Sequence, residues 1–290
     1  MIFDTHAHYS RHQFNDEFGA WTFDGDGFSV ERFTRESLFD KMRQSGIVGV
    51  VLASMEFEKI PTQLALAKAY PDFLYVAVGV HPKYCRLAEW KERARLEGYL
   101  KEGNAVAVGE TGLDYHIRER KEQRRFAQKR WFRYQIGLAD RLGLPLILHV
   151  RNADTTALRI LRRKRKKLHG GVAHCFHSDL ETARAYLSLG FAIGIGGKIL
   201  GDGEEAKTLC RTVEGLSLHD ILLETDAPFV APADAVAGLN RKQRPKIFNS
   251  SLILPAVVQK IAELKGISLE EVERITTENA YRVFGIGEKE

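Results

Sequence analysis

Two histidines near the N-terminus are the first residues of this 290-residue sequence whose type and spacing could do chemistry. They are His6 and His8, and they follow a short apolar run. Successive side chains of a β-strand point to opposite faces, so a spacing of two places both imidazoles on one face. Two imidazoles on one face supply half of a metal site. The ordinary alternative is a pair of stacked histidines in a surface loop.

Two later apolar runs end in residues of similar chemistry. Glu110 follows Gly109 and precedes Gly112, and its carboxylate could bridge two cations where glycines allow a close approach. The structural alternative is a glutamate held in a salt bridge. His149 and Arg151 share one strand face, which suits a metal ligand beside a group that clamps an anion through paired hydrogen bonds.

His174 and Asp226 end two further apolar runs. Asp226 is placed to act as a ligand or as a proton acceptor, and Glu224 faces the same way one layer deeper, where it would support the ligands. Each residue has an ordinary structural explanation by itself. Four histidines and two carboxylates at the ends of five such runs are difficult to attribute to coincidence.

The runs that position these residues have the β-branched and aromatic content of buried strands. They are Ile2–Thr5, Ile47–Ala53, Phe73–Gly79, Ala105–Gly109, Leu144–Val150, Gly171–Cys175, Phe191–Ile195 and Ile221–Thr225. Amphipathic helical patterns separate them: Arg35–Ser45, Ile60–Tyr70, Ala88–Lys101, Glu119–Leu142, Thr155–Lys167, Leu180–Leu189 and Glu204–Glu214. Leu252–Lys265 and a further C-terminal helix, Ser268–Phe284, follow the last strand.

This alternation predicts an α/β fold, a (β/α)8 TIM barrel with an extra C-terminal helix. A doubly wound open sheet is the main alternative. Nothing in the sequence marks a linker or a repeat, so we expect residues 1–290 to form a single domain. Catalytic groups of such barrels lie at the C-terminal ends of the strands, which is where the six candidate ligands stand.

At these residues the sequence resembles the TatD family of metal-dependent deoxyribonucleases, within the amidohydrolase-like barrels. The resemblance spans nearly the whole chain. The matching motifs are Asp4–His8, Gly79–Pro82, Gly109–Asp114, Leu146–Arg151, His174–Phe176, Gly194–Gly197, Leu223–Pro228 and Thr277–Ala280.

The resemblance implies two divalent cations, Mg²⁺ first and Mn²⁺ or Zn²⁺ as alternatives. It implies that His6, His8, Glu110 and Asp226 bind one cation, and that Glu110, His149 and His174 bind the second. A cation pair can activate a bridging water and neutralise a phosphoryl oxygen. We expect Asp226 to accept the proton of that water.

Two other side chains are expected to act on the substrate. Arg151 would hold the phosphate, and His81, from the Gly79–Pro82 motif, would help it. A packing or ligand-supporting role for His81 is an equal alternative.

Several segments depart from the family pattern, and such loops choose the substrate. Residues 9–34 form an expected loop that is long and aromatic, and residues 238–245 differ as well. The basic segments His116–Arg125 and Asn240–Lys246 belong to the expected top face and fit a phosphodiester backbone, or serve only solubility. The basic run Arg162–Lys167 ends a helix at the opposite face, where a solvated helix end explains it better than a nucleic-acid site.

Composition sets wider bounds on location and partners. The net charge of +5 is compatible with a polyanionic partner but does not require one. Three widely spaced cysteines indicate reduced thiols, and with no visible signal peptide we expect a cytoplasmic protein. The apolar runs are too short to span a membrane. The oligomeric state stays open, with a monomer as the simplest case.

The leading hypothesis is a deoxyribonuclease, a metal-dependent hydrolase of ester bonds that trims single-stranded DNA ends. One alternative is a hydrolase of an amide, lactone or aminoacyl ester on the same metal platform. Glu110 stands where many cyclic amidases carry a carbamylated lysine, which weighs against that version. Another alternative is a non-catalytic binding subunit, which the full ligand set opposes.

Overall fold

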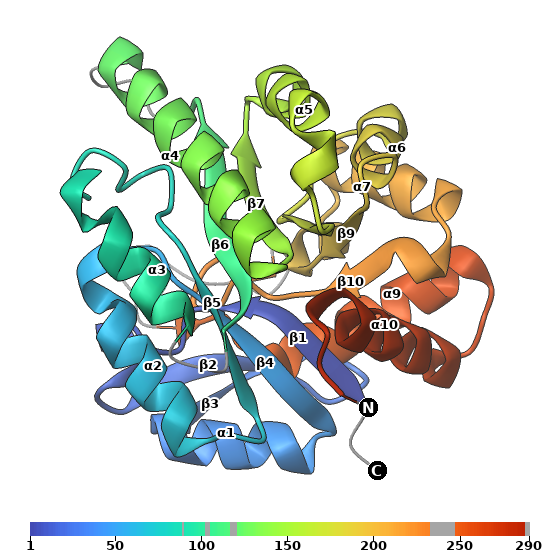
Figure 1. Cartoon of the computed structure of the whole chain (residues 1–290). Helices are drawn as coiled ribbons and strands as arrows, with labels where there is room; N and C mark the ends of the chain where they lie inside the picture. The colour runs from blue at the N-terminus through green and yellow to red at the C-terminus, as the bar shows by residue number, and fades with distance from the viewer. Residues whose placement is uncertain (89, 102–104, 117–120, 233–246, 288–290) are drawn as a thin grey trace. The chain divides into compact units, whose positions relative to one another are not determined.

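The computed structural model describes residues 1–290 except 89, 102–104, 117–120, 233–246 and 288–290 (Figure 1). An eight-stranded sheet is its main feature. In sheet order its strands are β1 (Ile2–Ala7), β4 (Ile47–Ala53), β5 (Leu74–Val78), β6 (Ala105–Asp114), β7 (Leu146–Arg151), β8 (Gly171–His174), β9 (Phe191–Ile195) and β10 (Ile221–Leu223). The eight predicted strands are all present, and neighbours pair in parallel from β5 through β9.

Helices follow the strands as predicted. They are α1 (Arg35–Gln44), α2 (Ile60–Ala69), α3 (Arg93–Lys101), α4 (Lys121–Leu142), α5 (Asp154–Arg163), α6 (Leu180–Leu187), α7 (Glu204–Gly215), α9 (Leu254–Lys265) and the C-terminal α10 (Leu269–Phe284). The (β/α)8 barrel with an extra C-terminal helix is therefore confirmed. None of the helices in the described residues has both the length and the apolarity needed to cross a bilayer.

The chain divides into two compact units, each built from several segments. The first comprises Met1–Val51, Cys175–Ala183 and Gly194–Ala280. The second comprises Leu52–His174, Arg184–Ile193 and Tyr281–Glu290. The expectation of a single domain over residues 1–290 stays a prediction.

The first unit joins the first strand of the sheet to the last, as a closed barrel requires. Ala7 forms a parallel bridge with Ala227 just beyond β10. The His8 backbone N–H donates to the Ala227 carbonyl at 2.7 Å, and the Asp226 N–H donates to the His6 carbonyl at 2.8 Å. These bonds hold the carboxyl end of β1 beside the segment that carries Asp226.

The first unit also contains a second sheet that sequence analysis missed. Residues 9–34 are not the expected loop: β2 (Phe18–Phe23) and β3 (Phe28–Phe33) form an antiparallel hairpin, and β11 (Ile247–Phe248) pairs in parallel with β2. The turn Asp24–Gly27 carries its own signal, because the Asp24 carboxylate accepts the N–H groups of Asp26 and Gly27 at 3.1 and 3.0 Å. Aromatic residues on both sides of this turn mark the hairpin.

The second unit contains the long helix α4 and the shorter helix α5. α4 runs alongside β6 in Figure 1, and α5 follows β7 after two intervening residues. β6 and β7 approach closely at Gly112, which pairs with His149. A Cβ atom at Gly112 would lie 2.1 Å from the His149 carbonyl oxygen, so this position needs glycine.

Candidate metal centre

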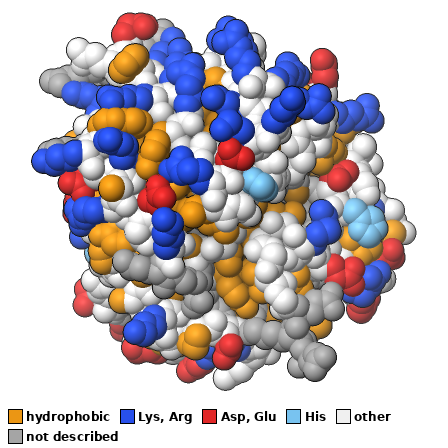
Figure 2. All heavy atoms as spheres, in the orientation of Figure 1, with side chains coloured by type: hydrophobic (Ala, Val, Ile, Leu, Met, Phe, Trp, Pro, Cys, Tyr) orange, Lys and Arg blue, Asp and Glu red, His pale blue; other side chains and the backbone are white. Residues whose placement is uncertain are grey.

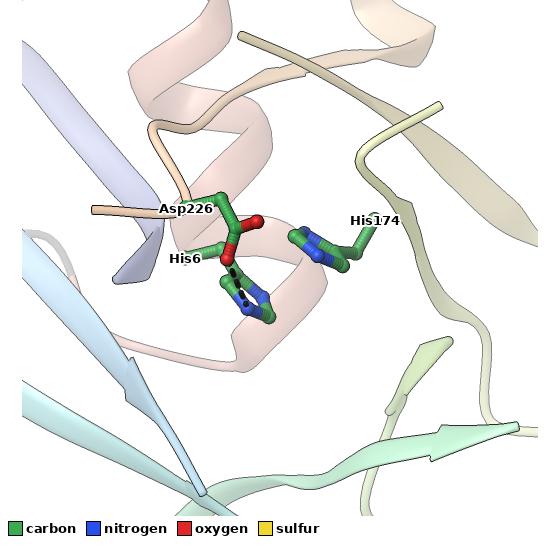
Figure 3. Close-up of side chains that lie close together, drawn as sticks. All are labelled: His6, His174 and Asp226. Atoms are coloured by element: carbon green, nitrogen blue, oxygen red, sulfur yellow. Dashed lines mark ion pairs between the residues drawn. The ribbon is translucent and has the colours of Figure 1, made fainter. Parts of the chain in front are cut away.

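Three predicted ligands gather in the first unit. The His8 Nε2 atom lies 3.0 Å from the Asp226 Oδ1 atom, and the His6 Nε2 atom lies 3.8 Å from the same oxygen. Figure 3 draws the ion pair between His6 and Asp226 as a dashed line. Both imidazoles are buried, and their rings meet edge to face. Asp226 has a φ of 57°, a left-handed conformation that aspartate adopts more readily than most residues.

Asp4 forms hydrogen bonds with the segments that carry these candidate ligands. Its carboxylate is fully buried and accepts the His6 N–H (3.1 Å), the Thr225 N–H (3.1 Å) and hydroxyl (2.7 Å), and the Ser251 hydroxyl (2.6 Å). Burial raises the pKa of Asp4 to about 7, and the hydrogen bonds from Ser251, Thr225 and His6 limit the rise. The carboxylate therefore links β1 to the segment before Asp226 and holds both candidate ligands in position.

The second unit surrounds one buried carboxylate with three imidazoles. The Glu110 side chain, 2% exposed, places its Oε1 atom 3.2 Å from the Nδ1 atom of His149. The Nε2 atoms of His174 and His81 each lie 3.7 Å from the same oxygen. His81, Glu110 and His149 each offer one ligand atom within 4.8 Å of the others. This mixture of imidazole nitrogen and carboxylate oxygen suits a divalent cation.

Hydrogen bonds orient two of these rings. The Lys83 N–H donates to the Nδ1 atom of His81 at 2.9 Å, so a neutral His81 carries its proton on Nε2. That nitrogen lies 3.2 Å from the Nδ1 atom of His149, to which it can donate. A neutral His149 that accepts this bond carries its own proton on Nε2, the nitrogen that lies 3.7 Å from the Asp114 carboxylate.

The charge balance at His149 is dominated by acidic neighbours. Its Nε2 atom lies 3.7 Å from Asp114. Burial alone lowers the pKa of His149, but Asp114 and Glu110 outweigh burial and raise it. Burial likewise raises the pKa of Asp114, yet the contact with His149 outweighs it and holds that pKa below its usual range. The surroundings of His149 therefore favour positive charge, which is what a cation site requires.

Comparison with known proteins decides the family. A profile described as "TatD related DNase" matches residues 3–285. The chain belongs to the TatD DNase family. The resemblance seen in the motifs is thereby confirmed.

Two curated relatives and one solved structure illustrate the family. The "Uncharacterized metal-dependent hydrolase YabD" of Bacillus subtilis is 30% identical over 286 residues, covering 99% of this chain and 100% of the relative. A "3'-5' ssDNA/RNA exonuclease TatD" of Edwardsiella piscicida is 32% identical over 245 residues, covering 84% of this chain and 90% of the relative. The crystal structure of YJJV, a TatD homologue from Escherichia coli, has a TM-score of 0.80 at 27% identity, covering 99% of this chain and 98% of that one.

Ser54, which no motif identified, connects the strands around Glu110 in this TatD-family protein. The Ser54 hydroxyl donates to the Gly79 carbonyl at 2.9 Å and accepts the Gly79 N–H at 2.7 Å, while the Ser54 carbonyl accepts the Glu110 N–H at 3.2 Å. Ser54 therefore links β4, β5 and β6 at the level of Glu110. A polar residue directly after an apolar strand was the available signal, but the partners of Ser54 could not be read from the sequence.

Glu224, the carboxylate that the sequence predicted to support the ligands, directly follows β10. It is buried and its Oε1 atom accepts the Cys175 N–H at 2.5 Å. A Cβ atom on Gly194 would come within 2.3 Å of the Glu224 Oε2 atom, so the first glycine of the Gly194–Gly197 motif makes room for this side chain. The motif serves packing around a buried carboxylate.

The predicted site residues thus form two clusters, and Arg151 belongs to neither. His6, His8 and Asp226 lie together in the first unit. Glu110, His149, His174 and His81 lie together in the second. Arg151 is exposed two residues beyond His149, and within the described residues its guanidinium has no ion-pair partner. The predicted basic segment Asn240–Lys246, and residues 117–120 of His116–Arg125, lie outside the described residues.

Proposed function

We propose that this TatD-family protein is a divalent-metal-dependent deoxyribonuclease that trims single-stranded ends by phosphodiester hydrolysis. The observation that carries the proposal is the buried Glu110 carboxylate with three imidazoles around one of its oxygens. A buried carboxylate with imidazole nitrogens around it is a donor set for metal ions.

The assignment of these residues to two cations stays a prediction. His6, Glu110, His149 and His174 lie in their strands, His8 lies one residue beyond β1, and Asp226 lies three residues beyond β10. Catalytic groups of parallel barrels lie at the carboxyl ends of strands, which supports their assignment as ligands. One cation would bind His6, His8, Glu110 and Asp226, and the other Glu110, His149 and His174, so Glu110 would serve both.

Side chains of this protein would carry out the other steps of the hydrolysis. A bound cation pair lowers the pKa of a water towards about 7 and offsets charge on a phosphoryl oxygen. Asp226 accepts the proton of the attacking water, and Arg151 holds the phosphate through its guanidinium. His81 either helps to hold the phosphate or orients His149, and its 3.2 Å contact with that ring favours orientation.

A nucleic-acid substrate is supported by an exposed aromatic residue beside the ligands. Phe229, 36% exposed, packs edge to face on His8 with ring centroids 5.8 Å apart. The Arg11 guanidinium lies 5.3 Å from the centre of the Phe229 ring. An aromatic face beside a guanidinium can stack an unpaired base, which a duplex does not offer. The relative named "3'-5' ssDNA/RNA exonuclease TatD" supports a 3'-to-5' direction and leaves RNA as a second substrate to test.

The metal identity and the cellular setting belong to the proposal as well. Mg²⁺ is proposed first, with Mn²⁺ and Zn²⁺ as alternatives, because mixed imidazole and carboxylate ligands accept all three. A cytoplasmic location stays a prediction, and so does a monomer. No observation favours the amide, lactone or aminoacyl ester alternatives, or the binding subunit.

The test is cleavage of a single-stranded oligonucleotide labelled at its 5' end. We expect a ladder that shortens from the 3' end with Mg²⁺ or Mn²⁺ and that stops with a chelator. A phosphorothioate cap on the 3' end should block it. The Glu110→Gln variant should be inactive. A fully active Glu110→Gln variant, or cleavage that a chelator does not affect, would contradict the proposal.

A further inference from the structure

A cavity of about 150 Å³ lies between α4 and α5, in the second unit. Most of the residues that line it are cationic. They are Lys129 and Arg133 from α4, Arg159 and Arg163 from α5, and Lys164 at the end of α5. No carboxylate lines it among the described residues. We call it the α4–α5 groove.

The cations form two facing rows. Lys129 and Arg133 are four residues apart on α4, and Arg159 and Arg163 are four residues apart on α5. Residues at this spacing are neighbours on a helix surface, and two like charges there repel each other. The groove therefore brings two repelling pairs towards one space, an arrangement that an anion would relieve.

Neighbouring acids do not neutralise these charges. Within the described part of the chain, none of the five cations forms an ion pair. Asp140, near the end of α4, pairs instead with Lys167 at 3.1 Å. Lys and Arg side chains gather on the surface over α4 and α5, as Figure 2 shows.

A solvated helix end, the explanation offered for Arg162–Lys167 from the sequence, accounts for only part of this cluster. Arg163 lies in the last turn of α5, where positive charge is favoured by the helix dipole. Lys129 and Arg133 lie in the middle of the 22-residue α4, beyond the reach of either helix end. Their position opposite α5 needs another explanation.

The groove begins near the ligand-bearing end of β7. Thr156, which also lines it, follows Arg151 by five residues, and His149 by seven. From Thr156 to Lys164 α5 rises about 12 Å at ~1.5 Å per residue. A strand held at Arg151 could therefore continue along α5 within the same unit.

We propose that the α4–α5 groove binds the phosphodiester backbone of the nucleic-acid substrate, away from the bond being cut. This inference rests on the proposed function. The groove makes long strands better substrates than short ones, through charge rather than sequence, because backbone contacts carry no base information. It holds the strand while its end is trimmed.

The experiment compares the double variant Arg159→Gln/Arg163→Gln with the wild type and with Arg162→Gln/Arg165→Gln. The control removes two exposed cations of the same basic run that do not line the groove. Substrates are single strands of about four and about twenty nucleotides, lengths that bracket known single-strand site sizes.

We expect the groove variant to raise KM about tenfold for the long strand, since two charge-assisted contacts are lost. Its kcat/KM for the short strand should equal that of the wild type. The salt dependence of long-strand binding should weaken by about 1.4 in log–log slope, at ~0.7 per phosphate contact. The control should match the wild type throughout. A groove variant that keeps the full length preference overturns the inference.

Two further readouts separate the possible failures. If the wild type cleaves neither strand, the proposed function fails, and fluorescence anisotropy of the long strand on the uncleaving protein still tests the groove. Tighter binding by the wild type than by the groove variant then supports the inference, and equal binding overturns it. Inorganic phosphate is the second probe. Inorganic phosphate is added at the same concentration as the phosphate groups of the strand. If it displaces the strand, the groove binds free phosphate and the inference is overturned.

Discussion

The carboxylate of Glu110 and the ring of His149 face each other at 3.2 Å, from Oε1 to Nδ1, although 39 positions separate them in the chain. Two neighbouring parallel strands, β6 and β7, make this possible, because Gly112 lets the second strand approach at the level of His149. The pair lies where His81 and His174 also reach the carboxylate. Several outcomes can be expected from this arrangement.

Replacing Glu110 by glutamine should abolish activity with little change of shape. The amide keeps the volume but removes the charge that two cations would share. We expect kcat to fall by about 10³-fold or more, since a metal contributes several kcal/mol to the transition state. Glu97→Gln is the matched control, because Glu97 pairs with Arg141 and Lys101 on the surface. Equal loss in both variants would show that the effect is not specific to Glu110.

Replacing Asp4 by asparagine should destabilise the part of the fold that positions His6 and Asp226. The Asp4 carboxylate accepts hydrogen bonds from His6, Thr225 and Ser251, and an amide group would turn one acceptor into a donor facing them. The free energy of unfolding should fall by about 1–3 kcal/mol, the cost of an unsatisfied buried group. Urea unfolding measures this, with Asp24→Asn, in an exposed turn, as the control. A variant as stable as the wild type would show that the hydrogen bonds of Asp4 do not stabilise the fold.

Divalent cations should stabilise the folded protein. A ligand at 100 times its dissociation constant adds about 2.7 kcal/mol to the free energy of unfolding. In a chain of this size that corresponds to a rise in Tm of roughly 5–10 °C. Thermal unfolding with and without Mn²⁺ measures it, and the shift should shrink in His149→Ala and in His8→Ala. A Tm that neither Mn²⁺, Mg²⁺ nor Zn²⁺ changes would argue against a cation site.

Phe229 should matter only when a base is present to stack on it. For Phe229→Leu we expect kcat/KM on a single strand to fall about tenfold, since stacking contributes about 1–3 kcal/mol per base. Phe229→Trp should retain activity. On a strand with abasic sites at its 3' end, the wild type and Phe229→Leu should be equally slow. If the leucine variant loses the same factor on the abasic strand, stacking is not the cause.

The positions of the candidate ligands were accessible from the sequence because each depends on local pattern. A strand-like run, its end and a spacing of two were enough to select His6, His8 and His149. Parallel barrels then bring strand ends together without further information. The hairpin of β2 and β3 was missed because its aromatic residues were attributed to a loop, although the Asp24–Gly27 turn marks it.

Features built from distant partners could not be predicted. Asp4 binds Thr225 and Ser251, which lie more than 220 positions away, and no local pattern announces such contacts. The α4–α5 groove is another example. From the sequence, the basic run that ends α5 was interpreted as a solvated helix end. A binding role for it is indicated only by the structure, in which Lys129 and Arg133 line the same groove.

The most direct test of the central claim is anomalous X-ray diffraction from crystals of the full chain grown with Mn²⁺. We predict two anomalous peaks about 3.5–4 Å apart. Glu110 should bind both ions, His6, His8 and Asp226 one of them, and His149 and His174 the other. The absence of a peak, or a single ion that Glu110 does not touch, would contradict the account.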